Sequence, residues 1–567
     1  MRSLSGLKRS IWVSDFETTT DPLDCRVWAW GMTDLEDIEN VIIDKDMSSF
    51  VAMVSDSDKI VYFHNLKFDG KFIIDWLLRN RYTHTTNKTV RVSRFSTLIS
   101  GMGQFYSIKV HWHNGRQTEF RDSMKKIPMS VKNVAHAFNL DISKGEIDYH
   151  LTRPVGWEIT PEERDYLERD VMIVAEALKI QIDEGMKKLT VGADSLAEFK
   201  ELTGKKLFDR LFPILSGPID AEIRRAYRGG FTYADKRTQG KIVGAGRVFD
   251  VNSLYPSVMF DRLLPYGLPI PFTYDPEDLP GYPLYIVSLT FTAKLKPNHI
   301  PCIQIKGSNF FAGALYQENI TEPITMSCTN VDLALWEDQY DLEILEFHGG
   351  WAFHGASGVF AQYISKWMKV KAENTGGLRA IAKLHLNALY GKFATNPDVT
   401  GKVPVMQEND VVKYVVGEPE TRDPVYTAMG AFITAYARDV TIRAAQAHYA
   451  EFLYADTDSL HLLGTGDPES LRVHPTDLGA WKHESDFTHA IFTRAKCYTE
   501  EVVGECHCEE KHVGPCLETH IAGMPSNIAR VVRLEHHLTG MKYEGKLMPQ
   551  SVPGGVVLLP TTFELKI

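Results

Sequence analysis

Short apolar runs that break at acidic residues recur along the chain, and each predicts a strand that carries carboxylates. In residues 11–20, IWVSDFETTT, an apolar run gives way to alternation, so Asp15 and Glu17 share one face of the predicted strand. A second strand is predicted to end at Asp250, followed by a turn and the start of a helix. Apolar residues also flank Asp456 and Asp458, which predicts a hairpin with its turn at the two acids.

Helical spacing predicts further sets of polar side chains. A helix is predicted to begin at residues 160–163, which supply a threonine N-cap, a proline at the first position and a capping-box glutamate. On that helix Tyr166 and Asp170 lie four residues apart and therefore share one face. Asn65 and Asp69 have the same spacing and stack on one side if their segment is helical.

A turn at residues 374–377, NTGG, is predicted to separate two more helical segments. The second segment has one polar face, formed by Arg379, Lys383, Asn387 and Tyr390. Residues 361–402 carry seven lysines and arginines against two acidic residues. The chain thus has a local basic region, although its net charge of −11 argues weakly against a general nucleic-acid binder.

Composition sets the scale of the molecule. With 567 residues, of which 44% are hydrophobic and 24% charged, the chain is long enough for roughly three or four globular domains. No apolar run approaches the roughly 18 residues of a membrane-spanning helix, and the run near the start is too short for a secretory signal. We therefore expect no membrane partner, and seven cysteines that are reduced thiols of a cytosolic protein rather than a disulfide framework.

The acidic positions of the N-terminal third suit metal-dependent hydrolysis. The carboxylates of Asp15, Glu17, Asp69 and Asp170 are oxygen ligands of the kind that hard divalent cations prefer. Two such ions roughly 3.5–4 Å apart activate a water and stabilise the leaving oxygen of a phosphodiester, and Tyr166 could orient that water. Taken singly, each pair is more simply a solvated acidic face, so the hypothesis depends on all of them together.

The later motifs suggest nucleotide transfer. The basic helix face would bind the triphosphate of an incoming nucleotide, with Tyr390 packing against the nascent base pair. Asp250 and Asp458 would carry the metals that bridge this triphosphate to a primer 3′-hydroxyl. For the helix alone, a solvated polar face is the alternative interpretation.

The motifs together resemble those of a known family. DFE, HNLKFD and YLERD resemble the three motifs of DEDD-type 3′–5′ exonucleases, and DVNSLYPS, KLHLNALYGKF and YADTDS resemble motifs A, B and C of family B DNA polymerases. AYRGGF resembles the linker motif between exonuclease and polymerase domains, while TAYAR and KCY resemble template–primer and primer-terminus motifs. The whole chain is similar to the protein-primed family B DNA polymerases of the small Bacillus-phage type.

This resemblance implies an α/β and α+β multidomain fold, in which an RNase H-like DEDD exonuclease domain precedes a right-hand polymerase with two insertions. The first insertion would contact a terminal protein, and the second, predicted to be a hairpin, would encircle DNA and give processivity and strand displacement. Decoration of the palm is the alternative for both. The implied boundaries are 1–190 for the exonuclease domain, 191–261 and 425–526 for the palm, 262–358 and 396–424 for the insertions, 359–395 for the fingers and 527–567 for the thumb.

The resemblance also assigns roles to residues. At the exonuclease site it implies the metal ligands Asp15, Glu17, Asp69 and Asp170, with Tyr166 and Lys144 as further catalytic residues. At the polymerase site it implies the metal ligands Asp250, Val251, Asp456 and Asp458, with Asp456 binding either directly or through water. The nucleotide would contact Tyr255, which excludes a 2′-hydroxyl, and Lys371, Lys383, Asn387 and Tyr390. DNA or the terminal protein would contact His64, Asn65, Phe68, Phe72, Ser123, Met124, Tyr227, Gly229, Gly230, Thr434, Arg438, Lys496 and Tyr498.

The implied function is replicative DNA-directed DNA synthesis with 3′–5′ proofreading, started from a hydroxyl of a terminal protein and extended with strand displacement. The partners would be template–primer DNA, the displaced single strand, deoxynucleoside triphosphates (dNTPs) and the terminal protein. The cofactors would be two Mg²⁺ ions at each site, with Mn²⁺ as an alternative. We expect a monomer in the cytoplasm of an infected bacterial host.

Cysteine and histidine are dense in residues 506–520. Such density could ligate zinc, through Cys506, Cys508, His512 and Cys516. Because the spacing is not the paired two-residue pattern of a zinc ribbon, we expect an exposed, reduced loop without zinc.

Two other classes of protein fit parts of the sequence: a nuclease whose C-terminal half only binds DNA, and a non-enzymatic replication scaffold. Loss of motif carboxylates would favour either one, and none of the expected carboxylates is missing.

Overall fold

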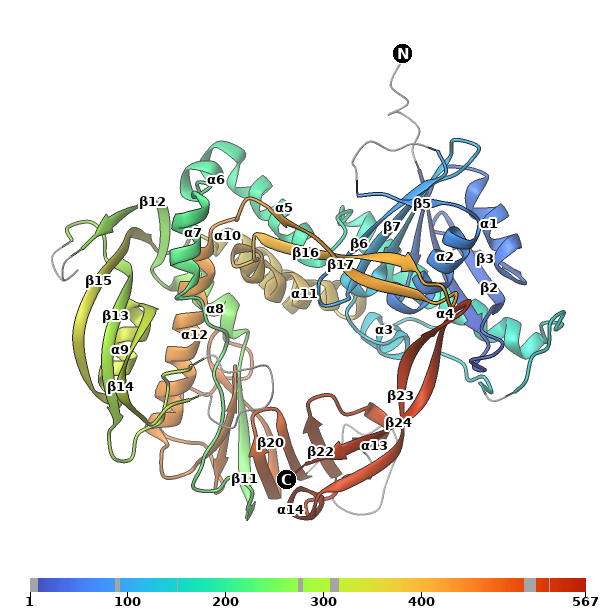
Figure 1. The fold of residues 1–567 in the computed structure, drawn as a ribbon. Helices are drawn as coiled ribbons and strands as arrows, with labels where there is room; N and C mark the ends of the chain where they lie inside the picture. Colours follow the sequence, from blue (N-terminus) through green and yellow to red (C-terminus); the bar gives the residue numbers. More distant parts are fainter. Residues whose placement is uncertain are drawn as a thin grey trace.

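The computed structural model describes residues 9–86, 92–149, 151–273, 279–305, 316–503, 516–529 and 531–566. These residues form three sheets of four or more strands and two long two-stranded hairpins, with helices packed between the sheets (Figure 1). None of the helices within these ranges has the length and apolar character needed to span a bilayer.

An eight-stranded sheet forms the N-terminal region, in the order β3-β2-β1-β4-β8-β7-β6-β5. Its centre is parallel, because β4 pairs in parallel with both β1 and β8. Helix α4 packs across β1 to β3, and α2 packs on β7, β8 and β4. The bounds are β1 Ser10–Thr18, β2 Val27–Asp34, β3 Asp37–Asp44, α1 Met47–Ser55, β4 Lys59–Phe63, α2 Leu66–Arg79, β5 Thr83–His84, β6 Arg94–Ile99, β7 Phe105–His111, β8 Gln117–Asp122, α3 Val131–Phe138 and α4 Pro161–Asp183.

Helix α4 begins as its sequence predicts. Thr160 accepts a hydrogen bond from the Glu163 amide at 3.2 Å, and the Glu163 carboxylate accepts one from the Thr160 amide at 3.0 Å. That carboxylate also accepts a hydrogen bond from Arg153 Nε at 2.7 Å, and the guanidinium lies 4.4 Å from the Trp28 ring centroid. Arg153 thereby fixes the preceding loop against the start of α4.

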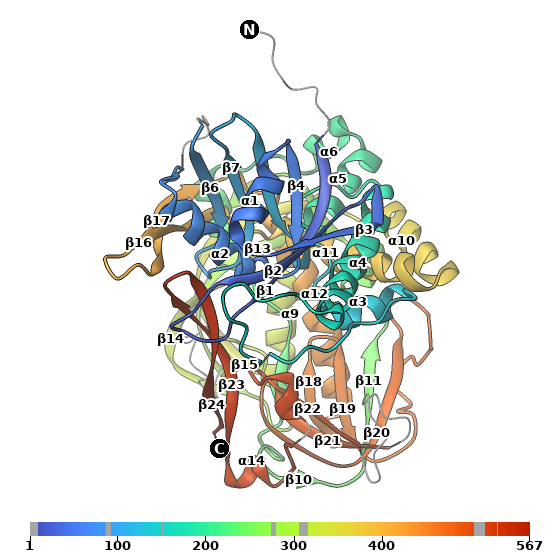
Figure 2. The ribbon, with the colours of Figure 1, turned by 90° about the vertical axis from the view of Figure 1, so that its right-hand side faces the viewer.

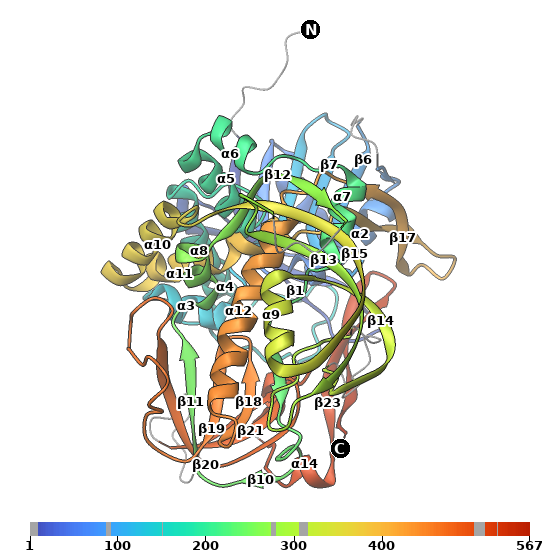
Figure 3. The same ribbon diagram turned by 90° about the vertical axis from the view of Figure 1, so that its left-hand side faces the viewer.

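A mostly C-terminal antiparallel sheet has the order β22-β21-β20-β11-β19-β18-β9, with β10 paired to β20. β11 lies at its centre, so Asp250 faces Ser459 on one neighbouring strand and Lys482 on the other. Helix α12 packs on β18 and β19 (Figure 3). The bounds are β9 Thr232–Ala234, β10 Ile242–Val243, β11 Gly246–Val251, α12 Thr427–Ala447, β18 Phe452–Asp456, β19 Ser459–Leu463, β20 Trp481–Arg494, β21 Cys497–Val503 and β22 Cys516–Ile521.

A four-stranded sheet, ordered β12-β15-β13-β14, lies on the other side of α12 (Figures 1 and 3). Helix α9 packs on this sheet and on α12. The bounds are β12 Leu264–Phe272, β13 Leu284–Leu295, β14 Asn319–Thr329, α9 Asn330–Gln339 and β15 Tyr340–Ala356.

Helices α10 and α11 form a pair between the N-terminal sheet and the sheet that carries β11 (Figure 1). The turn between them lies where the NTGG segment predicts it. Their neighbours include α3, α4, α5 and α8. The bounds are α5 Val191–Thr203, α6 Lys205–Leu211, α7 Gly217–Arg224, α8 Leu254–Asp261, α10 Ala361–Glu373 and α11 Gly376–Phe393.

Two hairpins from distant parts of the chain end on helix α2 (Figure 2). β16 Asp398–Met406 pairs with β17 Val412–Thr421, as its alternating pattern predicts, and β23 Met541–Val552 pairs with β24 Gly555–Leu565. Arg79 of α2 donates to the Asp410 carbonyl at the first tip, 2.9 Å away, and Asp75 accepts from the Gly554 amide at the second, 3.2 Å away. Arg79 and Asp75 are ion-paired at 2.7 Å, so one ion pair holds both tips. Short helices α13 Ser526–Ala529 and α14 His536–Thr539 precede the second hairpin.

Candidate active sites

A pocket of about 910 Å³ lies between the N-terminal sheet and the hairpin β23–β24. β1 contributes two carboxylates, α2 contributes a third, and α4 contributes the fourth. Nine of the residues predicted from sequence, from four separate segments, therefore meet in one place. They are Asp15, Glu17, His64, Asn65, Phe68, Asp69, Lys144, Tyr166 and Asp170.

The carboxylates of this pocket are crowded and desolvated. Burial, followed by the nearby Asp170 charge, raises the pKa of Asp15 to about 7, although Lys144 opposes the shift. Burial and the charge of Asp15 also raise the pKa values of Glu17 and Asp69 well above their usual range. Burial lowers the pKa of Lys144, but its ion pair with Asp170 outweighs that effect and leaves the pKa raised. Such a cluster favours the binding of protons or cations.

The donor set fits a hard divalent cation. Asp170 Oδ1 is buried without a hydrogen-bond partner, while its Oδ2 is bound by Lys144. Four carboxylates around one pocket are the oxygen ligands that such cations prefer. Within the described ranges, however, no three His, Cys, Asp or Glu side chains are close enough to one another to enclose an ion as they stand.

Two features of this pocket were missed by sequence reasoning. The Tyr149 hydroxyl is 2.7 Å from that of Tyr166, in the same loop that carries Lys144. The far wall is the apolar hairpin β23–β24, through Leu547, Leu558 and their neighbours. Nothing in the local sequence links a hairpin near residue 550 to Asp15, because the contact is purely tertiary.

Four predicted DNA contacts near the pocket differ in exposure. Ser123 is fully buried and lies 2.8 Å from His64 Nδ1, so it positions the histidine that lines the pocket. Met124 is half-buried. Phe72 is 2% exposed, and a Cβ at Gly555 would lie 2.5 Å from its ring. Direct contact of Ser123 and Phe72 with DNA stays a prediction, and both side chains are buried in this structure.

A second pocket, of about 380 Å³, lies between the sheet around β11 and helices α10 and α11. Helices α10 and α11 thus place basic side chains opposite the acidic side chains of β11 and of the β18–β19 turn. The predicted residues that line it are Asp250, Val251, Lys371, Lys383, Asn387 and Asp458. Lys482 and Glu484 also line it and were missed, although they alternate on one face of β20.

Asp250 and Asp458 meet because a strand lies beside a hairpin turn. The predicted hairpin is present as β18–β19, and the Val251 amide donates to the Asp458 carbonyl at 2.8 Å. Burial, then the charges of Asp458 and Glu484, raises the pKa of Asp250 to about 7. Burial also raises the pKa of Asp458. Like the first pocket, this one holds carboxylates in an arrangement that a cation would stabilise.

Asp456 has a different environment from its neighbour. Lys496 Nζ binds both of its carboxylate oxygens, at 2.8 and 2.7 Å, and Thr232 donates to it at 2.9 Å. Asp456 is not among the residues that line the second pocket. Its partners are one lysine and the hydroxyls of Thr232, Thr457 and Tyr454, so a direct role as a metal ligand would require Lys496 to move.

The predicted nucleotide-binding tyrosines pack together beside the second pocket. The rings of Tyr255 and Tyr390 are stacked, with centroids 4.0 Å apart. Lys371 donates to Ser253 at 3.1 Å. Burial, then the charges of Lys383 and Arg379, lowers the pKa of Lys371, and the charge of Asp250 only partly opposes that shift.

The linker motif YRGG touches the acidic turn. The Thr457 amide donates to the Phe231 carbonyl at 2.6 Å. A Cβ at Gly230 would lie 2.7 Å from Thr457 Oγ1, so only glycine permits this approach. Tyr227, from the same motif, is half-buried.

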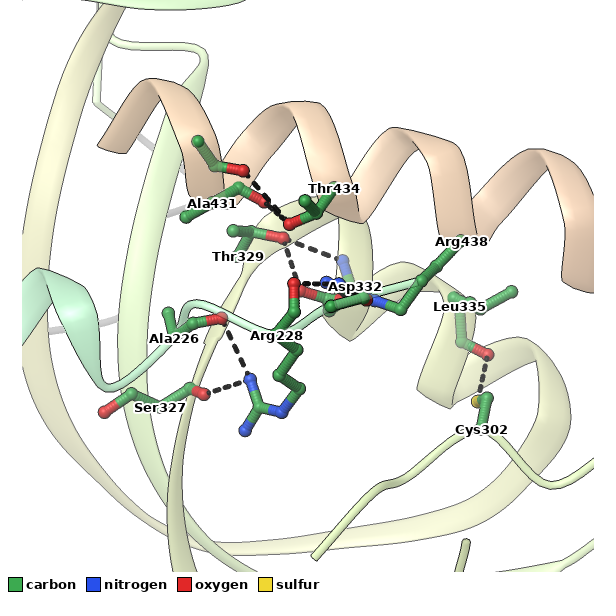
Figure 4. Close-up of polar contacts among 12 residues, drawn as sticks. Ala226, Arg228, Cys302, Ser327, Thr329, Asp332, Leu335, Ala431, Thr434 and Arg438 are labelled. Carbon is green, nitrogen blue, oxygen red and sulfur yellow. Dashed lines mark hydrogen bonds and ion pairs between the residues drawn. The ribbon is translucent and has the colours of Figure 1, made fainter. Parts of the chain in front are cut away.

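Thr434 and Arg438, predicted to contact DNA, are 1% and 4% exposed. Figure 4 shows Arg438 beside Asp332 and Thr434 beside Ala431. Arg438 donates to the Gly229 carbonyl at 2.8 Å and pairs with buried Asp332 at 2.7 Å. Thr434 donates to carbonyls one turn back in its own helix. Direct contact with DNA stays a prediction for both, and in this structure Arg438 fixes the glycine linker from inside the protein.

At the predicted primer-terminus motif, Lys496 has a side chain that is 60% exposed, whereas Tyr498 is 9% exposed and stacks on His520. Cys516 takes part in a disulfide, which contradicts the expectation of reduced thiols at this position and removes it as a zinc ligand. Cys506, Cys508 and His512 lie outside the described residues. Cys25, Cys302, Cys328 and Cys497 are free thiols.

Comparisons with known proteins agree across nearly the whole chain. Residues 52–156 and 147–473 match the model of a family described as DNA polymerase type B, organellar and viral. A DNA polymerase of Bacillus phage Nf is 44% identical over 574 residues, covering 99% of this chain and 100% of that protein. The solved Phi29 DNA polymerase complexed with primer-template DNA and incoming nucleotide substrates has a TM-score of 0.92 at 44% identity, over 99% of this chain and 100% of that one. Phi29 DNA polymerase complexed with single-stranded DNA has a TM-score of 0.92 at 43% identity, with the same coverage.

Proposed function

The chain belongs to the type B DNA polymerases of organelles and viruses, and from this premise we propose that it copies DNA from a protein primer, displaces the opposite strand and proofreads its product. The observation that best supports synthesis is the second pocket, where Asp250 and Asp458 face the lysines of α10 and α11. Relatives solved with primer-template DNA, nucleotides and single-stranded DNA support the same partners here.

For synthesis, one group of residues would bind the incoming nucleotide and another would bind the primer end. Lys371 and Lys383 bind and orient the triphosphate, since charge-assisted hydrogen bonds to phosphate are strong and directional. Tyr255, stacked under Tyr390, lies below the sugar and leaves no room for a 2′-hydroxyl. Lys496, partly released from Asp456, holds the primer end.

Proofreading belongs to the first pocket. Its apolar hairpin wall and Phe68 would hold unstacked bases without regard to sequence. Tyr166, hydrogen-bonded to Tyr149, orients the attacking water, and Lys144 neutralises the phosphate that is cut. Asp170 keeps Lys144 in position for that contact.

Metal ions would be held by Asp15, Glu17, Asp69 and Asp170 in the first pocket and by Asp250, Val251 and Asp458 in the second. When bound, two magnesium ions at each site, or manganese in their place, supply the charge that activates an attacking oxygen and stabilises a leaving one.

The remaining segments have roles in replication. Residues 262–358, the four-stranded sheet with α9, would contact the terminal protein. The hairpins β16–β17 and β23–β24, with their tips joined at α2, would surround DNA and so give processivity and strand displacement. The protein would act as a monomer in the cytoplasm of an infected bacterium.

Measuring primer extension and single-stranded DNA degradation separately, in variants of each pocket, tests the two-site proposal. Asp458→Ala should abolish extension of a primed template but keep degradation of single-stranded DNA, and Asp15→Ala with Asp69→Ala should do the reverse. Loss of both activities from a folded single-site variant would refute the division. Protein priming predicts a covalent product between an added terminal protein and a nucleotide from at least one of the four labelled dNTPs, and its absence with active enzyme would refute that part alone.

A further inference from the structure

A lysine that no motif singles out lies inside the second pocket. Lys482 on β20 is directly opposite Asp250 on β11. Opposed residues of antiparallel strands project to the same face of the sheet, and both side chains line the pocket of about 380 Å³. The side chain of Lys482 is 41% exposed, so a ligand in the pocket can reach its ammonium group.

The charges around Lys482 place it between the two halves of the site. Its ammonium lies near enough to oppose the rise in the pKa of Asp250 on the sheet and to add to the lowering of the pKa of Lys371 on α10. Among the described residues it donates one hydrogen bond, to Glu484 Oε1 at 2.8 Å. An ammonium group has three donors, so two remain for a ligand.

We propose that Lys482 is a further binding residue for the phosphates of the incoming nucleotide and for the pyrophosphate product, an inference that rests on the proposed nucleotide transfer. Lys371, Arg379 and Lys383 all belong to the helical side of the pocket, whereas Asp250, Asp458 and Glu484 make the sheet side acidic. A polyphosphate between them would be repelled by those carboxylates that no bound metal ion neutralises. Lys482 supplies a cation from the sheet side itself, and Glu484 holds the ammonium in place until the phosphates arrive.

Steady-state kinetics on a primed template test this role. Lys482→Ala should raise the KM for all four dNTPs by about threefold to tenfold, as expected for loss of a partly solvated charged hydrogen bond. The KM for pyrophosphate in the reverse reaction should rise in parallel, while kcat and the Kd for primer-template stay nearly unchanged. Lys482→Arg should restore both KM values. Lys369→Ala is the matched control, because Lys369 lies two residues from Lys371, is 72% exposed and does not line the pocket.

Each other outcome overturns the inference. An unchanged KM with weaker primer-template binding would make Lys482 a DNA-backbone contact. If Lys482→Ala lowers the melting temperature and impairs KM, kcat and primer-template binding equally, Lys482 acts only as the structural partner of Glu484. Wild-type protein that incorporates no nucleotide would refute the proposed function, whereas an active Lys482→Ala with wild-type KM values would refute the role of Lys482 alone.

Discussion

Replacing Asp15 by asparagine should stabilise the metal-free protein at neutral pH. Burial and the Asp170 charge raise the pKa of Asp15 from 3.8 to about 7. A group whose pKa is higher in the folded state holds its proton more tightly there, so its ionisation disfavours folding. The penalty is absent below the unfolded pKa, grows as the pH rises, and is complete above about 7. Asparagine keeps the shape of the side chain and removes this penalty.

The size of the effect follows from the shift. About three pKa units at 1.36 kcal/mol each give a ceiling of about 4 kcal/mol. Asp15 is half-buried and faces the pocket, so water reduces the expected gain to about 2 kcal/mol. For a domain of roughly 150–250 residues, a gain of about 2 kcal/mol raises the melting temperature by roughly 4–8 °C.

Thermal unfolding in excess chelator measures the gain. We expect Asp15→Asn to melt above wild type at pH 8 and to show a smaller difference at pH 5. Added Mg²⁺ should then raise the wild-type melting temperature more than that of the variant. Asp165→Asn is the control, because Asp165 is exposed on α4 and its replacement removes the same charge at a position outside the pocket. A variant that is neutral or less stable at pH 8, or a gain that does not shrink at pH 5, would show that the reasoning is wrong.

Three other substitutions test contacts described above. Gly230→Ala should slow nucleotide incorporation by about tenfold to hundredfold, because the new Cβ displaces Thr457 between the two acids; a wild-type rate on primed template would contradict this. Phe72→Ala should lower the free energy of unfolding by about 3–5 kcal/mol in urea titrations, and a negligible loss would argue against its burial. Arg153→Lys should slow degradation of single-stranded DNA but not incorporation, because lysine cannot hold Glu163 and the loop carbonyls together; equal losses in both assays would count against this role.

Several helices and strands could be predicted from local signals in the sequence. The capping box at Thr160 and Glu163 depends on neighbouring residues only, so the start of α4 was predictable. The hairpin at Asp456 and Asp458 was predictable for the same reason, since its apolar flanks alternate around a turn. Residue types in these elements then identified most of the acids and cations that line the two pockets.

Tertiary contacts account for what the sequence could not reveal. Arginine commonly contacts DNA, so the sequence predicts such a contact for Arg438. In the structure Arg438 is buried and pairs with Asp332, which is 106 residues away in the chain. Asp456 and Asp458 look equivalent in sequence, but Lys496 binds only the first. Lys482 is recognisable only once β20 is known to lie beside β11.

The wall that β23–β24 gives to the first pocket has a consequence for the order of synthesis. A ribosome completes residues 15–170, which carry the four carboxylates, long before it reaches residues 545–560. Until then the nascent pocket lacks its apolar side, and Phe72 lacks the glycine that covers it. The acidic cluster therefore becomes an enclosed site only when the last hairpin docks, after the second pocket has been translated.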